Sequence, residues 1–367
     1  MADRAKTPQR QLAMVFDLNK CLGCQTCSIA CKTLWTDLEG MEYMWWNVVN
    51  TLPGKGSPRD WMQIAGGFDA QGKSKPSQLP TSEDFGVAWD YNYDEVWNGG
   101  PNVVLTKDRE TNWGMNWDED EGDGEWPNSY FFYLPRICMH CTRPACLEAC
   151  PRTAIYKRED NGTVLIDEQR CHGYRFCAEA CPYKRIYFNP QRRLSQKCVL
   201  CFARVEQGVP PACMRQCPGR VRFFGYLDDE TSAVYRLVKQ WKVAIRLHPE
   251  FGTEPNLYYV PPLAPPRLLP NGDIDESTPR IPKEYLESLF GPDVWPALDT
   301  LKTEIEKRQR GEPSELMDTL IAYRHKDMFG GFTKDPGTLE RKPSRVKAGP
   351  LFSPGTTPDA PNPMEAG

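Results

Sequence analysis

The sequence has few histidines and no long apolar segment. Only four histidines occur in 367 residues, and no stretch approaches the roughly 18–20 consecutive apolar residues that a membrane helix needs. The first residues, 1–11, are polar and charged, so we expect no secretory signal on this chain. A net charge of −4 gives no reason to expect a nucleic-acid partner.

The usual patterns of catalytic residues are also missing. We find no nucleophile–base pair, no glycine-rich phosphate loop and no histidine–carboxylate metal set. The acidic run 118–125 lacks the residue order of an EF-hand, so it is interpreted as a solvated loop. We therefore expect a chain without an active site of its own.

Cysteine, by contrast, is abundant, and its fifteen residues fall into four tightly spaced groups. Disulfides are disfavoured because the count is odd and neighbours stand only a few residues apart. The first group has the C-x2-C-x2-C-x3-C run of bacterial ferredoxins, which predicts iron–sulfur clusters. A zinc-bound structural scaffold, which uses C-x2-C pairs, is the alternative. In chain order the groups are Cys21, Cys24, Cys27 and Cys31; Cys138, Cys141, Cys146 and Cys150; Cys171, Cys177 and Cys181; and Cys198, Cys201, Cys213 and Cys217.

The third group has one cysteine fewer than the others. On the ferredoxin spacing its second ligand falls at position 174, which is Tyr174. A phenol is a poor substitute for a thiolate in iron–sulfide chemistry, so the unsupported iron should be absent. This predicts a [3Fe-4S] cluster. The alternative is a [4Fe-4S] cluster whose odd iron takes water or Tyr174 itself.

The segments around the four groups resemble the beta subunits of the type II dimethyl-sulfoxide-reductase family of molybdoenzymes. That family includes nitrate, perchlorate and selenate reductases, dimethyl sulfide dehydrogenase and ethylbenzene dehydrogenase, and the resemblance covers about residues 10–330. In the nitrate reductases a tryptophan stands at the position of Tyr174. The segments are DLNKCLGCQTCSIACKTLW, ICMHCTRPACLEACP, CHGYRFCAEACPYKRIYFNP and KCVLCFARVEQGVPPACMRQCPGR.

The resemblance implies three [4Fe-4S] clusters and one [3Fe-4S] cluster, each held by cysteines from two groups. We refer to the implied ligands as four sets. The first set is Cys21, Cys24, Cys27 and Cys217; the second is Cys31, Cys198, Cys201 and Cys213; the third is Cys138, Cys141, Cys146 and Cys181; the fourth, for the three-iron cluster, is Cys150, Cys171 and Cys177.

The same map implies an α+β fold with two nested, bacterial ferredoxin-like units. A short hairpin is expected at 155–156 and 164–166, and helices are expected within 283–325. Tryptophan is common in 36–135, which favours a docking surface for a large partner, with a local cover over the clusters as the alternative. The expected parts are unit 1 at 10–35 plus 190–228, a loop-rich insertion at 36–135, unit 2 at 136–189, a helical extension at 229–328 and an extended tail at 329–367.

By resemblance, the chain relays single electrons between a molybdopterin catalytic subunit and a haem b subunit, which is reached through the [3Fe-4S] end. A stand-alone polyferredoxin carrier is the alternative. We expect a periplasmic location, after export with a signal-bearing partner, and the cytoplasm is the alternative. Basic residues near the ligands would raise cluster potentials, or they are simply solvated. His140 and His172 are interpreted as neighbours of cluster ligands.

Overall fold

The computed structural model describes residues 7–86, 93–104, 106 and 122–338. Its twelve named strands form small sheets rather than one large one, and most of its helices are short. The strands are β1 Leu12–Asp17, β2 Val48–Leu52, β3 Phe132–Arg136, β4 Ile155–Lys157, β5 Val164–Ile166, β6 Ile186–Asn189, β7 Leu194–Lys197, β8 Arg222–Tyr226, β9 Ile245–Arg246, β10 Leu257–Val260, β11 Pro266–Leu268 and β12 Ile274–Pro279. The helices are α1 Thr26–Trp35, α2 Tyr93–Asn98, α3 Ala145–Glu148, α4 Phe176–Ala180, α5 Phe202–Val205, α6 Ala212–Arg215, α7 Ala233–Tyr235, α8 Lys283–Phe290, α9 Val294–Gln309 and α10 Glu315–Ile321.

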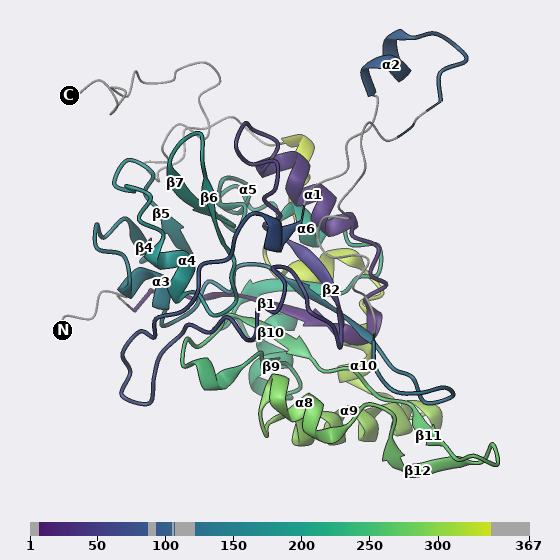
Figure 1. The fold of residues 1–367 in the computed structure, drawn as a ribbon. Helices are drawn as coiled ribbons and strands as arrows, with labels where there is room; N and C mark the ends of the chain where they lie inside the picture. Colours follow the sequence, from purple (N-terminus) through teal and green to yellow (C-terminus); the bar gives the residue numbers. More distant parts are fainter. Residues whose placement is uncertain (1–6, 87–92, 105, 107–121, 339–367) are drawn as a thin grey trace, which may run out of the picture.

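A four-stranded sheet in the order β8-β1-β10-β9 forms the centre of the molecule (Figure 1). All six residues of β1 are buried, as expected for a central strand with apolar residues on both faces. Strand β1 runs parallel to β10 and antiparallel to β8, with Phe16 opposite Arg222. The first cysteine group follows β1 and the fourth group precedes β8, so this pairing brings the two groups together.

The middle of the chain forms a second, smaller unit. Strands β4 and β5 form the expected hairpin, with Ile155 opposite Ile166, and β6 and β7 form another. Helix α3 of the second cysteine group packs against α4 of the third. These elements lie together at one end of the molecule (Figure 1). The fold is therefore mixed α and β with small sheets.

The tryptophan-rich insertion is partly built into the core. Strand β2 pairs with β3 in antiparallel register, and Trp46 and Trp61 are among the most buried large side chains. Both are part of the core, so the docking interpretation does not apply to them. Trp126 is 90% exposed. Trp89, Trp113, Trp117 and the acidic residues 118–121 lie outside the described residues.

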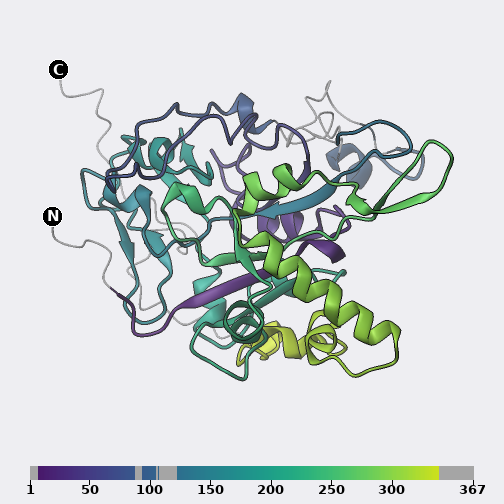
Figure 2. The same ribbon diagram turned by 90° about the horizontal axis from the view of Figure 1, so that it is seen from below.

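The expected helices of the C-terminal extension are α8, α9 and α10. Leu286, Leu289 and Phe290 are buried, as are Leu298 and Leu301. Helix α8 packs on the central sheet, and Figure 2 shows α8 and α9 on the side of the molecule away from the β4–β7 unit. The first residues of the expected tail pack on the rest of the protein. The Phe332 ring contacts Phe224 of β8 in a tilted arrangement, with ring centroids 4.8 Å apart. Residues 339–367 lie outside the described part.

Candidate metal centres

Two small cavities are lined by four cysteines each. One contains Cys21, Cys24, Cys27 and Cys217, and the other contains Cys31, Cys198, Cys201 and Cys213. These are the first and second sets. Helix α1 serves both cavities, because Cys27 and Cys31 stand one helical turn apart, and α1 packs against α6, which carries Cys213.

The remaining cysteines gather in the β4–β7 unit. Cys146, Cys177, Cys150 and Cys181 pack in one small apolar cluster. Electrostatic coupling joins Cys146 to Cys138, Cys141 and Cys181, which are the rest of the third set. Cys177 couples in the same way to Cys171 and Cys150, the rest of the fourth set. The structure thus brings the first and second sets together at one cavity each, and it places the other seven cysteines near one another.

The ligand loops share a backbone conformation. In each of the four groups, the residue two positions after the first cysteine has a left-handed backbone conformation. These residues are Gly23, His140, Gly173 and Leu200. At Gly23 a side chain would also collide with the Tyr133 ring, 2.5 Å from the Cβ position, so only glycine fits there.

The third group therefore folds like the first although one ligand is missing. Gln25 and Arg175, one residue beyond the second ligand position, are both left-handed and both cap a helix. Tyr174 thus takes the backbone position of Cys24. Its side chain is 56% exposed, with the His172 ring 6.1 Å away.

Several of the buried thiols are poor free thiolates. Burial raises the pKa of Cys21 to about 11 and the pKa values of Cys177 and Cys213 to about 12. Burial also raises the pKa of Cys31 well above its usual value, helped by the charges of Cys198 and the other cysteines around it. Cationic iron would replace the thiol proton, and metal binding is the usual way to stabilise thiolates in such a place.

Several donors point at the cysteine sulfurs. The Trp35 Nε1–H donates to Cys201 Sγ at 3.1 Å, and the Thr26 hydroxyl lies 3.5 Å from Cys24 Sγ. Backbone N–H groups of Ala154, Ser195 and Leu200 donate to Cys150, Cys171 and Cys198. Hydrogen bonds to ligand sulfurs are a recognised means of setting cluster potentials.

Two further donors lack a protein acceptor. Trp46 lines the cavity of the second set, and its buried Nε1–H has no partner among the described residues. His140 Nδ1 accepts the Val164 N–H at 3.1 Å, which leaves the proton on Nε2, also buried without a partner. Burial, with the charges of Lys197 and Lys157, lowers the pKa of His140 well below its usual value. Sulfide ions of a cluster are suitable acceptors for such donors, so the residues fit an iron–sulfur core.

No three histidine, cysteine, aspartate or glutamate side chains in the described ranges come close enough to share one metal ion. The cysteines of the first two sets line the two cavities described above.

Arg222 connects the first two cavities. It lines the first, and Asn47 lines the second. One guanidinium nitrogen donates to Asn47 Oδ1 at 2.9 Å and the other to Cys27 Sγ at 2.9 Å. Burial alone would lower the pKa of Arg222, but the sulfurs of Cys27, Cys213, Cys217 and Cys21 raise it above its usual value.

The four sets follow one another in space. Cys27 couples electrostatically to Cys31 and Cys213, which joins the first set to the second. Cys198 couples to Cys138, which joins the second to the third. The third and fourth sets share the apolar cluster of the β4–β7 unit. The sets therefore form a row.

The two ends of this row reach the surface beside exposed apolar side chains. At the first set, Cys24 and Leu22 are exposed, and the exposed Phe131 packs on Tyr133 against the Gly23 turn. At the fourth set, Tyr174 and Phe176 are exposed. All four cysteines of the second set are buried.

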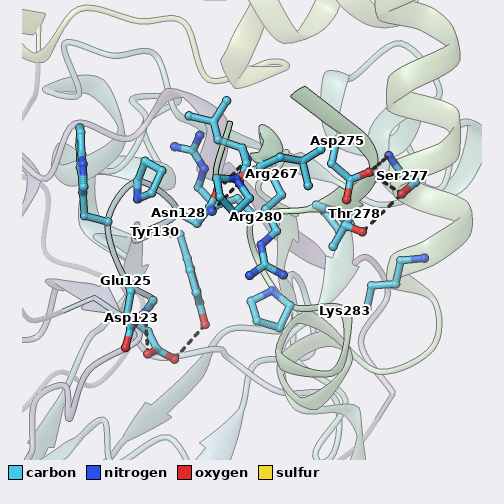
Figure 3. Close-up of a pocket in the computed structure, with 18 of the residues that line it drawn as sticks. Asp123, Glu125, Asn128, Tyr130, Arg267, Asp275, Ser277, Thr278, Arg280 and Lys283 are labelled. Atoms are coloured by element: carbon cyan, nitrogen blue, oxygen red, sulfur yellow. Dashed lines mark hydrogen bonds between the residues drawn. The ribbon is translucent and has the colours of Figure 1, made fainter. Parts of the chain in front are cut away.

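A surface groove lies between the 123–130 turn and the β11–β12 hairpin (Figure 3). Trp126 lines it, together with Arg267, Arg280 and Lys283. It contains no cysteine, so it is separate from the cluster sites. Of the tryptophans in the insertion whose side chains the structure describes, Trp126 is the exposed one, and the docking interpretation still applies to it.

The sequence did not reveal the roles of Trp35, Trp46 and Arg222. Trp35 is in a quoted motif, but nothing in the spacing indicates that its indole reaches Cys201, 166 residues away.

None of the described helices is both long and apolar enough to cross a bilayer.

Comparison with known proteins identifies an iron–sulfur domain and close relatives. A family model described as a 4Fe-4S dicluster domain matches residues 129–227. Dimethylsulfide dehydrogenase subunit beta of Rhodovulum sulfidophilum is 56% identical over 88% of this chain and 98% of its own length. Selenate reductase subunit beta of Thauera selenatis is 54% identical over 88% and 99%. Respiratory nitrate reductase 1 beta chain of Escherichia coli is 33% identical over 81% and 80%.

These matches establish an iron–sulfur protein whose role is electron transfer. More narrowly, the chain belongs to the beta subunits of the dimethyl-sulfoxide-reductase family of molybdoenzymes.

Proposed function

We propose that this chain carries single electrons along three [4Fe-4S] clusters and one [3Fe-4S] cluster, held by the four cysteine sets in order. The observation that carries the proposal is the pair of cavities lined by the first and second sets, in which residues almost 200 positions apart meet. Two nested ferredoxin-like units follow from this ligand map. Each cluster accepts and donates one electron, and the chain supplies ligands, donors and burial.

We propose a molybdopterin catalytic subunit as the partner at the Cys24 end and a haem b subunit at the Tyr174 end. Exposed apolar side chains beside both terminal sets support two contact faces, since a short path for an electron requires a close partner. The stand-alone carrier has less support because most relatives named above are subunits of reductases or dehydrogenases. Isolation of the native complex tests this: recovery of a monomer without a molybdenum subunit would contradict it.

We further propose that the complex works in the periplasm, exported folded with a signal-bearing partner. The sequence of the co-encoded large subunit tests this directly. A twin-arginine signal on that subunit is the expected result, and its absence would favour the cytoplasm.

Metal content provides the first test of the clusters. The anaerobically purified complex should be brown, with broad visible absorbance that bleaches on reduction, and should contain iron and acid-labile sulfide associated with this chain. A colourless chain that contains zinc would contradict the proposal. Iron bound without sulfide would also contradict it, because iron alone does not make a cluster.

Changing Trp35 to phenylalanine should lower the potential of the second cluster. The indole N–H stabilises the negative charge on Cys201 Sγ, and that charge is larger in the reduced cluster. We expect a shift of about 59 mV, a tenfold change for one electron. Redox titration followed by electron paramagnetic resonance (EPR) measures it. Trp61→Phe is the control, because Trp61 is also buried but lines neither cavity.

A further inference from the structure

The side chain of Arg222 is a buried cation without a carboxylate partner. It is 1% exposed, at the start of β8, and its guanidinium lies over the Phe16 ring at 4.3 Å. Its polar partners are the Asn47 amide oxygen and Cys27 Sγ, and no aspartate or glutamate in the described chain forms an ion pair with it. A buried charge needs compensation, so the negative charge must come from another source.

The compensating charge comes from both of the first two cysteine sets. The sulfurs that act on Arg222 most strongly are Cys27, Cys213, Cys217 and Cys21, three from the first set and one from the second. The charge of Arg222 also acts on the Cys213 thiol, whose pKa it lowers against the effect of burial. A cluster ligated by four thiolates has a net negative charge, which increases by one on reduction. Arg222 therefore stands between two groups whose charge changes as electrons pass.

We propose that Arg222 is a positioning residue that sets the potentials of the first and second clusters together, by placing one permanent positive charge between them. This inference rests on the proposed function, since it assumes the two clusters. Arginine keeps its charge at any working pH, so the effect does not depend on protonation. The positive charge favours the reduced, more negative form of each cluster and raises both potentials.

Sharing one charge has a second effect. When the first cluster is reduced, its added negative charge opposes the arrival of an electron on the second cluster, and the positive charge of Arg222 between them offsets part of that repulsion. Asn47 links Arg222 to the second cavity. Its Oδ1 accepts a hydrogen bond from Arg222, and Asn47 itself lines that cavity. Its amide nitrogen donates to Ser28 Oγ at 3.2 Å, which holds it in place.

The first test replaces Arg222 with glutamine in the complete complex. The Arg222→Gln variant should keep its iron and sulfide, and both potentials should fall, with each one-electron equilibrium constant changing at least about tenfold, or about 59 mV. The third and fourth clusters should not change. Arg222→Lys, which keeps the charge, should recover most of the shift. Redox titration monitored by EPR resolves the clusters, so the readout does not depend on turnover.

A second variant leaves Arg222 in place. Asn47→Asp keeps the shape of the side chain but puts a carboxylate oxygen beside the guanidinium and compensates its charge. Both potentials should again fall. If Arg222→Gln loses its clusters, Asn47→Asp still tests whether the charge of Arg222 sets the two potentials, because the hydrogen bond from Arg222 to Cys27 Sγ is retained.

The control is Arg185→Gln. Arg185 is also 1% exposed, but its side chain donates to backbone carbonyls, including those of Trp45 and Tyr183. Its loss should leave the first two potentials unchanged. Unchanged potentials in both Arg222→Gln and Asn47→Asp, with iron intact, would overturn the inference. A wild-type complex without EPR-active clusters would instead refute the proposed function.

Discussion

Replacing Cys31 with alanine should destroy the second cluster and leave the first cluster, which is built by the loop just before Cys31, in place. Cys31 lies on the same helix as Cys27 but lines the cavity of Cys198, Cys201 and Cys213. About a quarter of the iron bound by this chain should be lost. The rate of electron transfer through the complex should fall because the row is interrupted. The loss should exceed the roughly 10–100-fold loss that is typical when a residue that only contacts a metal ligand is replaced.

Iron analysis and EPR of the reduced complex would measure this result. Cys24→Ala is the matched control, because it removes a ligand of the first set from the same loop. It should affect the first cluster and leave the second. If Cys31→Ala instead removed the signal of the first cluster and kept the second, the ligand map would be wrong.

The change Tyr174→Cys should convert the three-iron cluster into a [4Fe-4S] cluster. Tyr174 has the backbone position of Cys24, with left-handed residues on both sides in each loop, so the new thiolate would stand where the fourth iron needs one. The EPR signal of the oxidised three-iron cluster should disappear, because an oxidised [4Fe-4S] cluster of this kind is diamagnetic. Its potential should fall by up to a few hundred millivolts, since cluster type is a main determinant of potential.

Tyr174→Phe separates this effect from the loss of the tyrosine. It removes the hydroxyl and adds no ligand, so the three-iron signal should remain unchanged. A lost or altered signal in Tyr174→Phe would indicate that the phenol binds iron. An unchanged signal in Tyr174→Cys, with the mutant chain verified, would show that position 174 does not face the open corner of the cluster.

The sequence predicts the cysteine groups well because cluster loops impose their own spacing. Gly23 and Gly173 are recognisable for the same reason, since the turn between ligands needs a left-handed residue. The β4–β5 hairpin and the C-terminal helices were also predictable from local pattern. In each case the information is contained within about twenty neighbouring residues.

Residues positioned by long-range pairing could not be predicted. Arg222 reaches Cys27 only because β8 pairs with β1 and places it opposite Phe16, a contact that no local pattern specifies. Trp46 reaches the second cavity from an insertion without regular periodicity. The parallel pairing of β1 with β10 joins segments about 240 residues apart. Such contacts depend on the whole fold rather than on propensity.

The cysteine sets also impose an order on biosynthesis. The third and fourth sets are complete once the ribosome has passed Cys181, and their ligands lie within one compact stretch of chain. The first and second sets each wait for the fourth group: Cys31 lacks its full complement until Cys213 has emerged, and Cys21, Cys24 and Cys27 lack theirs until Cys217 has emerged. On this ligand map, a nascent chain that stalls before Cys198 presents its N-terminal thiols to any competing metal or oxidant.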